Sequence, residues 1–176
     1  MTFAHLKRLA FVAGSMALTP SLAFSAETAT ASLTGTDGKT VGTAQITEAP
    51  RGVVLHIEVS GLTPGWHGMH FHEKGNCSAP AFTSAGSHVH TTKPVTHGLL
   101  NAGENDSGDL PNIFAGSDGT AKAEVYSTFV SLKGHDGRPA LLDADGSSLV
   151  IHASADDYQS QPIGGSGLRV MCGVIG

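Results

Sequence analysis

Apolar and polar residues alternate with a period of two along several short stretches of this chain. In the clearest stretch, four apolar side chains fall on the same face: Val53, Leu55, Ile57 and Val59. Successive side chains of a β-strand point to opposite faces of a sheet, so this pattern predicts a strand with one face buried. The same reasoning predicts strands over residues 29–33, 40–46, 66–72, 121–126, 148–152 and 169–175. No segment after residue 30 sustains the 3.6-residue period of an amphipathic helix.

The connections between these stretches carry residues typical of tight turns. Four Asp-Gly pairs begin at residues 37, 118, 136 and 145, and glycine readily adopts the positive φ that such turns require. Many short strands joined in this way predict an all-β barrel or sandwich. A length of 176 residues suits one domain that buries its own hydrophobic core.

The first 26 residues follow a different pattern. Lys7 and Arg8 precede an apolar run over residues 9–18 and a small-residue stretch over residues 23–26, an order typical of a secretory signal peptide. The apolar run is about half as long as the ~20 residues that a membrane-spanning helix requires. We therefore predict that residues 1–26 are removed, with cleavage one residue earlier left open. Residues 27–176 are expected to form a periplasmic or secreted domain without a membrane span.

Charge and cysteine content fit an exported protein. The formal net charge of −5 becomes −7 when Lys7 and Arg8 are removed, and an acidic surface argues against nucleic acid as a partner. The only two cysteines, Cys77 and Cys172, are expected to form a disulfide in an oxidising compartment. The alternative is a pair of free buried thiols. A cross-link that closes so long a loop stabilises the fold by roughly 4 to 5 kcal/mol in the chain-entropy model.

Residues 75–115 interrupt the alternation and contain several histidines and aspartates. A loop of this length inside a compact domain is usually functional or disordered, and metal coordination can order a loop that lacks an apolar core. A second loop, residues 156–167, is rich in glycine and polar residues and lies between His152 and Arg169. We expect the two loops to form the walls of one site.

Four histidines are candidates for a copper site. His70 and His72 lie two residues apart on a predicted strand, so both face the same side. With His88 and His152 they offer four imidazoles, which suit a copper ion that cycles between Cu(II) and Cu(I). His67 has the opposite parity and is predicted to have a structural, hydrogen-bonding role.

A second group of donors suits a different ion. His88, His97 and Asp109 combine imidazole nitrogen with carboxylate oxygen, a mixture that tetrahedral zinc accepts. Because His88 has two ring nitrogens, it could bridge both ions once deprotonated. The sequence therefore predicts two metal sites that share one ligand.

These features, taken in order along the chain, resemble the bacterial exported branch of the copper-zinc superoxide dismutases. The resemblance covers nearly all of residues 27–176, and its fragments are weak singly but specific as an ordered set. The fragments are Gly68-Met69-His70-Phe71-His72-Glu73, Gly75-Asn76-Cys77, Ala85-Gly86-Ser87-His88, His97-Gly98, Gly108-Asp109-Leu110-Pro111, Val150-Ile151-His152 with Asp156-Asp157, and Gly167-Leu168-Arg169 with Cys172-Gly173-Val174-Ile175.

The resemblance implies a Greek-key β-barrel, eight-stranded and of the immunoglobulin-like sandwich type. The barrel would carry a long metal-binding loop and a second active-site loop. The resemblance also implies the following ligand sets and cross-link: copper on His70, His72, His88 and His152, zinc on His88, His97 and Asp109, and a disulfide between Cys77 and Cys172.

The resemblance further implies roles for three other groups. Asp156 resembles the carboxylate that links a copper-ligand histidine to a zinc-ligand histidine and so orients both rings. Arg169 resembles the residue beside copper that attracts and orients the superoxide anion, and an always-charged guanidinium suits that task. The implied reaction converts superoxide to dioxygen and hydrogen peroxide, with one proton supplied by His88. This activity would protect the cell envelope from superoxide.

The chain departs from the family pattern at the zinc site. Asp106 stands three residues before Asp109, where the family usually has a histidine, and Val89-His90-Thr91 replaces the usual Phe-Asn-Pro. Three interpretations stay open. Asp106 is the fourth zinc ligand, His90 takes that position, or zinc binds weakly or not at all.

Two other functions compete with the dismutase prediction. A non-catalytic periplasmic copper-binding module on the same fold would need neither Arg169 nor Asp156. A cupin-like jelly roll also carries a His-x-His pair on a strand, but the bridging pattern and the two cysteines argue against it. The family includes dimers and monomers, so the sequence leaves a homodimer open.

Overall fold

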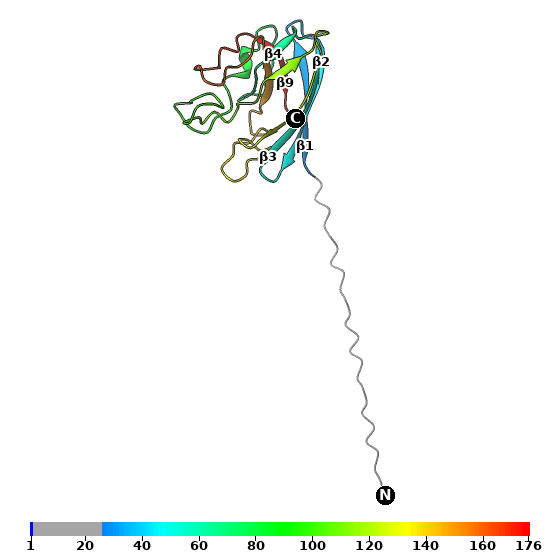
Figure 1. Cartoon of the computed structure of the whole chain (residues 1–176), viewed down its shortest axis with the longest axis vertical. Coiled ribbons are helices and arrows are strands. Elements are labelled where there is room, and N and C mark those ends of the chain that lie inside the picture. The colour runs from blue at the N-terminus through cyan, green and yellow to red at the C-terminus, as the bar shows by residue number, and fades with distance from the viewer. Residues whose placement is uncertain (2–25) are drawn as a thin grey trace.

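The computed structural model describes Met1 and residues 26–176, which fold into strands joined by loops (Figure 1). The strands are β1 (Thr28–Gly35), β2 (Thr40–Ala49), β3 (Gly52–Val59), β4 (Gly65–His67), β5 (Met69–His72), β6 (Ile113–Ala115), β7 (Ala121–Ser127), β8 (Ser148–His152) and β9 (Arg169–Val174). Within these residues the only helical element is one 3-10 turn, η1 (Thr83–Ala85). The predicted signal peptide lies, apart from its two ends, outside the described residues.

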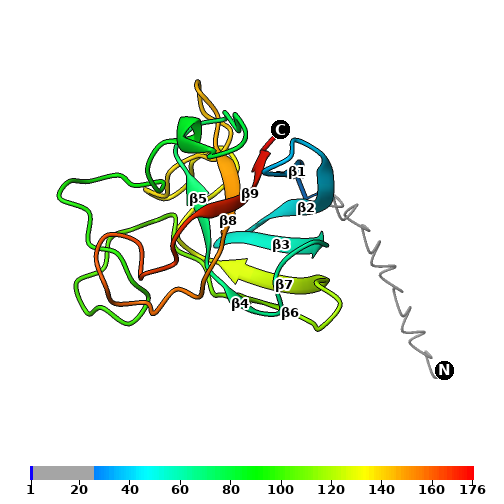
Figure 2. The same ribbon diagram turned by 90° about the horizontal axis from the view of Figure 1, so that it is seen from above.

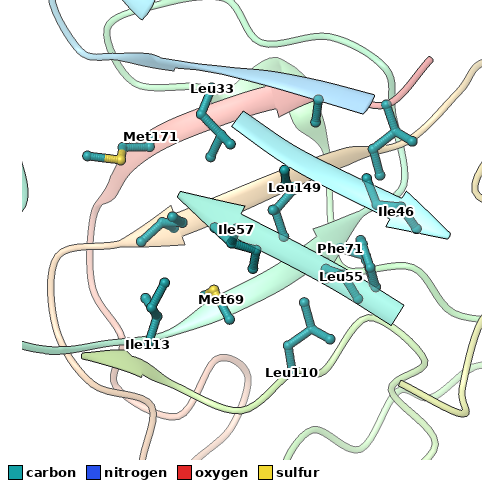
Figure 3. Close-up of a cluster of buried hydrophobic side chains, with 14 of the residues drawn as sticks. Leu33, Ile46, Leu55, Ile57, Met69, Phe71, Leu110, Ile113, Leu149 and Met171 are labelled. Carbon is teal, nitrogen blue, oxygen red and sulfur yellow. The ribbon is translucent and has the colours of Figure 1, made fainter. Parts of the chain in front are cut away.

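Seven strands form one antiparallel sheet in the order β5-β8-β9-β1-β2-β3-β7, and β4 pairs with β6 in a small second sheet. The large sheet curls, so that β5 and β8 lie across the core from β2 and β3 (Figures 2 and 3). The first and last strands, β1 and β9, are neighbours. This arrangement confirms the predicted all-β architecture. In the part of the chain that the structure describes, no helix is long and apolar enough to cross a membrane.

All seven strands predicted from the alternation are present, but one of them is divided. Gly68 separates β4 from β5, because its N–H donates to the carbonyl of Ser154 instead of to a strand. The chain comes so close at this point that a Cβ on Gly68 would lie 2.9 Å from the Cβ of Ser166. The short strand β6 was not predicted, since three residues are too few to show an alternation. The structure therefore has nine strands where the resemblance implies eight.

The hydrophobic core fills the inside of the curled sheet (Figure 3). It contains inward-facing side chains of eight strands, among them Leu33, Ile46, Leu55, Ile57, Phe71, Leu149 and Met171. Each such side chain stabilises the fold by about 1.5 to 3 kcal/mol through its burial. Met69 and Phe71 belong to this core, so the alternate residues of β5 face away from it and toward the loops.

A smaller apolar cluster packs on the other face of β8 and β9. It consists of Phe82, Ala85, Val150 and Cys172, with Cys77 against them. Cys77 and Cys172 form a disulfide with a Cα–Cα distance of 5.5 Å, as predicted. The disulfide ties the first loop to strand β9, three residues beyond Arg169.

The two long connections lie side by side on one side of the barrel (Figure 2). We call residues 73–112 the first loop and residues 153–168 the second loop. The N–H of Leu100 donates to the carbonyl of Tyr158 at 3.1 Å, and the amide of Asn101 donates to the carbonyl of Gln159 at 3.0 Å. The two loops that were predicted to form the walls of one site are therefore in contact.

Candidate metal centre

The four histidines of the predicted copper site come together between the sheet and the loops. His70 and His72 lie on β5, and His152 lies at the end of the neighbouring strand β8. His88 belongs to the first loop and is held beside β5 by a bridge to His72. All four side chains are buried, and their donor nitrogens lie within 4.8 Å of one another.

One nitrogen of each ring already has a hydrogen-bond partner. His70 Nε2 lies 2.7 Å from Asp156 Oδ2, and His88 Nδ1 lies 2.7 Å from Asp106 Oδ2. His72 Nδ1 and His152 Nδ1 lie 3.0 and 3.1 Å from backbone carbonyls. A hydrogen bond at one ring nitrogen fixes the ring's orientation and the role of the other nitrogen.

The other nitrogen of each ring is buried and has no partner among the described residues. These atoms are Nδ1 of His70 and Nε2 of His72, His88 and His152. Buried polar atoms are nearly always paired, so four unpaired ones in a single group call for an explanation. Four imidazole nitrogens are a donor set that copper accepts. The residues present therefore fit a copper ion.

A second group of donors lies on the far side of His88. His88 Nδ1 is 2.7 Å from Asp106 Oδ2 and 3.5 Å from Asp109 Oδ1. His97 Nδ1 is 3.4 Å from Asp106 Oδ2 and 2.7 Å from Asp109 Oδ1. Donors about 2.0 to 2.2 Å from a tetrahedral zinc ion are roughly 3.3 to 3.6 Å apart. Two of the four distances match this spacing, and the two of 2.7 Å are hydrogen bonds that would lengthen when zinc binds.

Two other histidines lie near this group but differ from its members. His70 is close to His97 and Asp109, yet its Nε2 is bonded to Asp156 and its Nδ1 belongs with the copper set. His90 Nδ1 lies 2.8 Å from the backbone carbonyl of His88. His90 is therefore engaged with the backbone, whereas Asp106 directs a carboxylate oxygen at both zinc-site imidazoles.

Asp156 connects the two groups of donors. One carboxylate oxygen lies 2.7 Å from His70 Nε2, and the other lies 3.1 Å from His97 Nε2. The backbone N–H of Tyr158 donates to the second oxygen at 2.6 Å. Burial raises the pKa of Asp156, but the hydrogen bonds from His70 and His97 outweigh it and hold the pKa below its usual range. The carboxylate is ionised and orients one ring of each group.

The two groups differ in their affinity for protons. Burial, together with the charges of His70 and His88, lowers the pKa of His152 to about 3, and burial likewise lowers the pKa of His72. Burial also disfavours the charged form of His97, but hydrogen bonds with Asp106, Asp109 and Asp156 outweigh it and raise the pKa to about 11. His72 and His152 of the metal-free copper set are thus neutral, whereas His97 carries a proton that a metal must displace.

Arg169 lies at the start of β9, beside the copper set. Its guanidinium donates to the carbonyls of Phe82 and Gly86 at 2.7 Å each. The Gly86 carbonyl also lies 3.0 Å from His72 Nδ1, so arginine and copper-site histidine share one acceptor. In the described part of the chain no carboxylate pairs with Arg169 within 4.0 Å. No carboxylate of the described residues therefore neutralises its charge.

Sequence reasoning found these side chains but missed the backbone groups that hold Arg169. A carbonyl oxygen exists at every residue and leaves no signal in the sequence. The structural role predicted for His67 is confirmed, because its Nδ1 lies 2.7 Å from the His152 carbonyl and its Nε2 lies 2.8 Å from the Thr63 carbonyl. His67 thus anchors the strand end that carries His152.

Comparison with known proteins places these features in a family. The family described as copper/zinc superoxide dismutase matches residues 40–175. A Cu-Zn superoxide dismutase from Caulobacter vibrioides is 65% identical over 147 residues, which is 84% of each chain. A second, from Aquifex aeolicus, is 37% identical over 172 residues, covering 97% of this chain and 99% of the relative.

Comparison with solved structures indicates the same family. A SOD-like protein from Bacillus subtilis aligns with a TM-score of 0.75 and 37% identity, covering 82% of this chain and 96% of that one. The Cu/Zn superoxide dismutase from Brucella abortus aligns with a TM-score of 0.68 and 31% identity, covering 85% of this chain and all of that one. On sequence and structure alike, this chain belongs to the copper/zinc superoxide dismutase family.

Proposed function

We propose that this chain is a superoxide dismutase, which converts superoxide to dioxygen and hydrogen peroxide. The observation that carries the proposal is a group of four buried imidazole nitrogens that have no partner in residues 26–176 and lie beside the guanidinium of Arg169. The family, with its 65% identical relative, supports the same activity. A copper-binding module without activity is not favoured, because it would need no anion guide.

His70, His72, His88 and His152 would hold copper, which when bound supplies one-electron chemistry by alternating between Cu(II) and Cu(I). The peroxide product needs two protons. His88 is suited to deliver one of them, because its Nε2 atom faces the copper set and has no hydrogen-bond partner among the described residues. Asp156 keeps the ring of His70 in place through its hydrogen bond to Nε2.

His88, His97, Asp109 and Asp106 would hold zinc, which undergoes no redox change and orders the first loop. We assign the fourth position to Asp106 because its oxygen lies within 3.4 Å of both imidazoles. His90 is the weaker candidate because its Nδ1 is already occupied by a backbone carbonyl.

Arg169 would attract and orient the superoxide anion. The mature chain is acidic overall, so a local positive charge is needed to offset the repulsion of an anion. Two backbone carbonyls fix the guanidinium near His72 without neutralising it.

The disulfide fits a protein that functions outside the cytoplasm. We propose that residues 1–26 direct export and are removed, and that residues 27–176 act in the periplasm or after secretion. A homodimer stays a prediction. The exposed pair Trp66 and Phe114, whose ring centroids are 5.0 Å apart, is a surface where a second copy could bind, and sedimentation equilibrium tests it.

The proposal is tested by measuring superoxide decay with the mature chain loaded with copper and zinc. Wild type should exceed an equal concentration of free copper, and His72→Gln should lose copper and fall to the background. The control is His56→Gln, which changes an exposed histidine paired with Glu58 and should retain full activity. A wild-type rate at the free-metal background would contradict the proposal.

A further inference from the structure

A side-chain amide of the second loop holds the backbone of His97. The oxygen of Gln161 accepts a hydrogen bond from the His97 N–H at 2.9 Å, and the Gln161 amide nitrogen donates to the His97 carbonyl at 2.8 Å. One side chain thus binds both backbone groups of one residue, as a neighbouring strand would, and the side-chain amide of Asn101 donates to the same carbonyl. The contact joins residues 64 positions apart.

A second amide makes the same contact in the opposite direction. The oxygen of Asn112, at the end of the first loop, accepts from the Asp156 N–H at 2.8 Å. Its amide nitrogen donates to the Asp156 carbonyl at 2.9 Å. The N–H of Asn112 donates in turn to the hydroxyl of Tyr158 at 2.7 Å. Each loop therefore holds one residue of the other.

The two residues held in this way are the ones that meet at the metal centre. His97 Nε2 lies 3.1 Å from Asp156 Oδ1, and the amides of Gln161 and Asn112 fix the backbone on each side of that contact. Neither amide occupies a ring nitrogen or a carboxylate oxygen of the donor groups. The contacts can therefore form before any metal binds.

We propose that Gln161 is a positioning residue for the second metal site, with Asn112 as its counterpart. Together they form a clasp that holds His97 and Asp156 in their binding positions before zinc arrives, which reduces the ordering that zinc binding would otherwise require. This inference rests on the proposed zinc site. Substitution of groups that orient metal ligands typically weakens metal affinity about 10- to 100-fold.

The test compares Gln161→Ala with Gln159→Ala in the full mature chain. Both positions are exposed and lie in the second loop, but Gln159 makes no side-chain hydrogen bond with the described residues, which makes it a matched control. Amide hydrogen exchange is measured without metal, and zinc and copper affinities are measured by competition with chelators. Asn112→Ala, which breaks the other half of the clasp, serves as a second variant.

We expect Gln161→Ala and Asn112→Ala to speed exchange over residues 156–167 and to weaken zinc binding about 10-fold. Copper affinity should fall less than zinc affinity, because three of the four copper histidines lie on β5 and β8 and only His70 is bonded to Asp156. Gln159→Ala should match wild type in every measurement.

The inference is overturned if Gln161→Ala and Gln159→Ala have equal zinc affinity. Faster exchange with unchanged zinc affinity also overturns it, since the clasp would then be only a structural contact. A wild-type chain that binds no zinc counts instead against the zinc site itself. Metal-free exchange still reports whether the clasp exists, so the two failures are distinguishable.

Discussion

The Nδ1 nitrogen of His88 lies 2.7 Å from a carboxylate oxygen of Asp106, at a position where the copper-zinc dismutases usually have a histidine. The same oxygen lies 3.4 Å from His97 Nδ1. Two carboxylates and two imidazoles therefore surround the second site, so that it combines two negative charges with two nitrogen donors. This donor set remains acceptable to zinc.

Asp106→Ala should weaken zinc binding at least about 10-fold while copper stays bound, because it removes a ligand from one site only. Metal content after dialysis, measured by mass spectrometry, checks this. Asp118→Asn is the control, since Asp118 is exposed and bonds only within its own turn. Zinc content that is unchanged in Asp106→Ala would rule out Asp106 as a ligand.

Zinc binding should release protons near pH 7.5. The pKa of His97 is raised to about 11 and that of His88 is also raised, so the metal-free site holds protons that zinc must displace. Titration calorimetry in buffers of different ionisation enthalpy gives the number released, which we expect to be at least about one per zinc. No dependence on the buffer would show that the imidazoles are already neutral.

The metal-free chain should lose stability as the pH falls from about 6.5 to about 3. In this window unfolded His152 takes up a proton, whereas the folded side chain, with its pKa lowered to about 3, does not. Protons therefore favour the unfolded state, and the contribution changes by about 1.4 kcal/mol per pH unit. Urea unfolding should show a smaller pH dependence for His152→Gln than for wild type. Equal slopes would contradict the assignment.

Substitutions at two adjacent glycines distinguish the cost of a strained backbone from the cost of a steric clash. Gly164 and Gly165 both have positive φ, of 59° and 69°. A Cβ on Gly164 would lie 1.7 Å from Asp156 Oδ1, whereas a Cβ on Gly165 would contact nothing within 4 Å. Gly165→Ala should therefore cost only the strain, roughly 1 to 2 kcal/mol.

Gly164→Ala should in addition displace Asp156 and weaken zinc binding. Zinc affinity and thermal unfolding of both variants check this prediction. Equal zinc affinity in the two variants would contradict it, because the second loop would then have accommodated the new Cβ without displacing Asp156.

Much of the fold could be predicted from the sequence because strand periodicity is a local signal. The alternation of Val53, Leu55, Ile57 and Val59 predicts β3, whose inner face is buried as expected. Strand β6 was missed because its three residues are too few to alternate. The break between β4 and β5 at Gly68 arises because the second loop packs against this residue. No local sequence pattern indicates such a contact.

The donor groups could be predicted partly from parity and partly from the resemblance. His70 and His72 share a face because they are two residues apart, but nothing near His88 in the sequence indicates that it joins them. Gln161 and Asn112 gave no signal at all. Their amides bind the backbone of distant residues, and a glutamine or asparagine in a polar loop is ordinarily a solvated side chain.

The most direct test of the central claim is superoxide decay after a radiolytic pulse, with copper and zinc bound, for wild type and Arg169→Ala. The control is Arg138→Ala, which removes the same charge from a different loop. A further variant, Arg169→Lys, keeps the positive charge but lacks the planar set of guanidinium donors. We predict that kcat/KM falls on the order of 10-fold or more in Arg169→Ala, less in Arg169→Lys, and less than twofold in Arg138→Ala. A wild-type rate no greater than that of free copper, or equal rates for wild type and Arg169→Ala, would contradict the account.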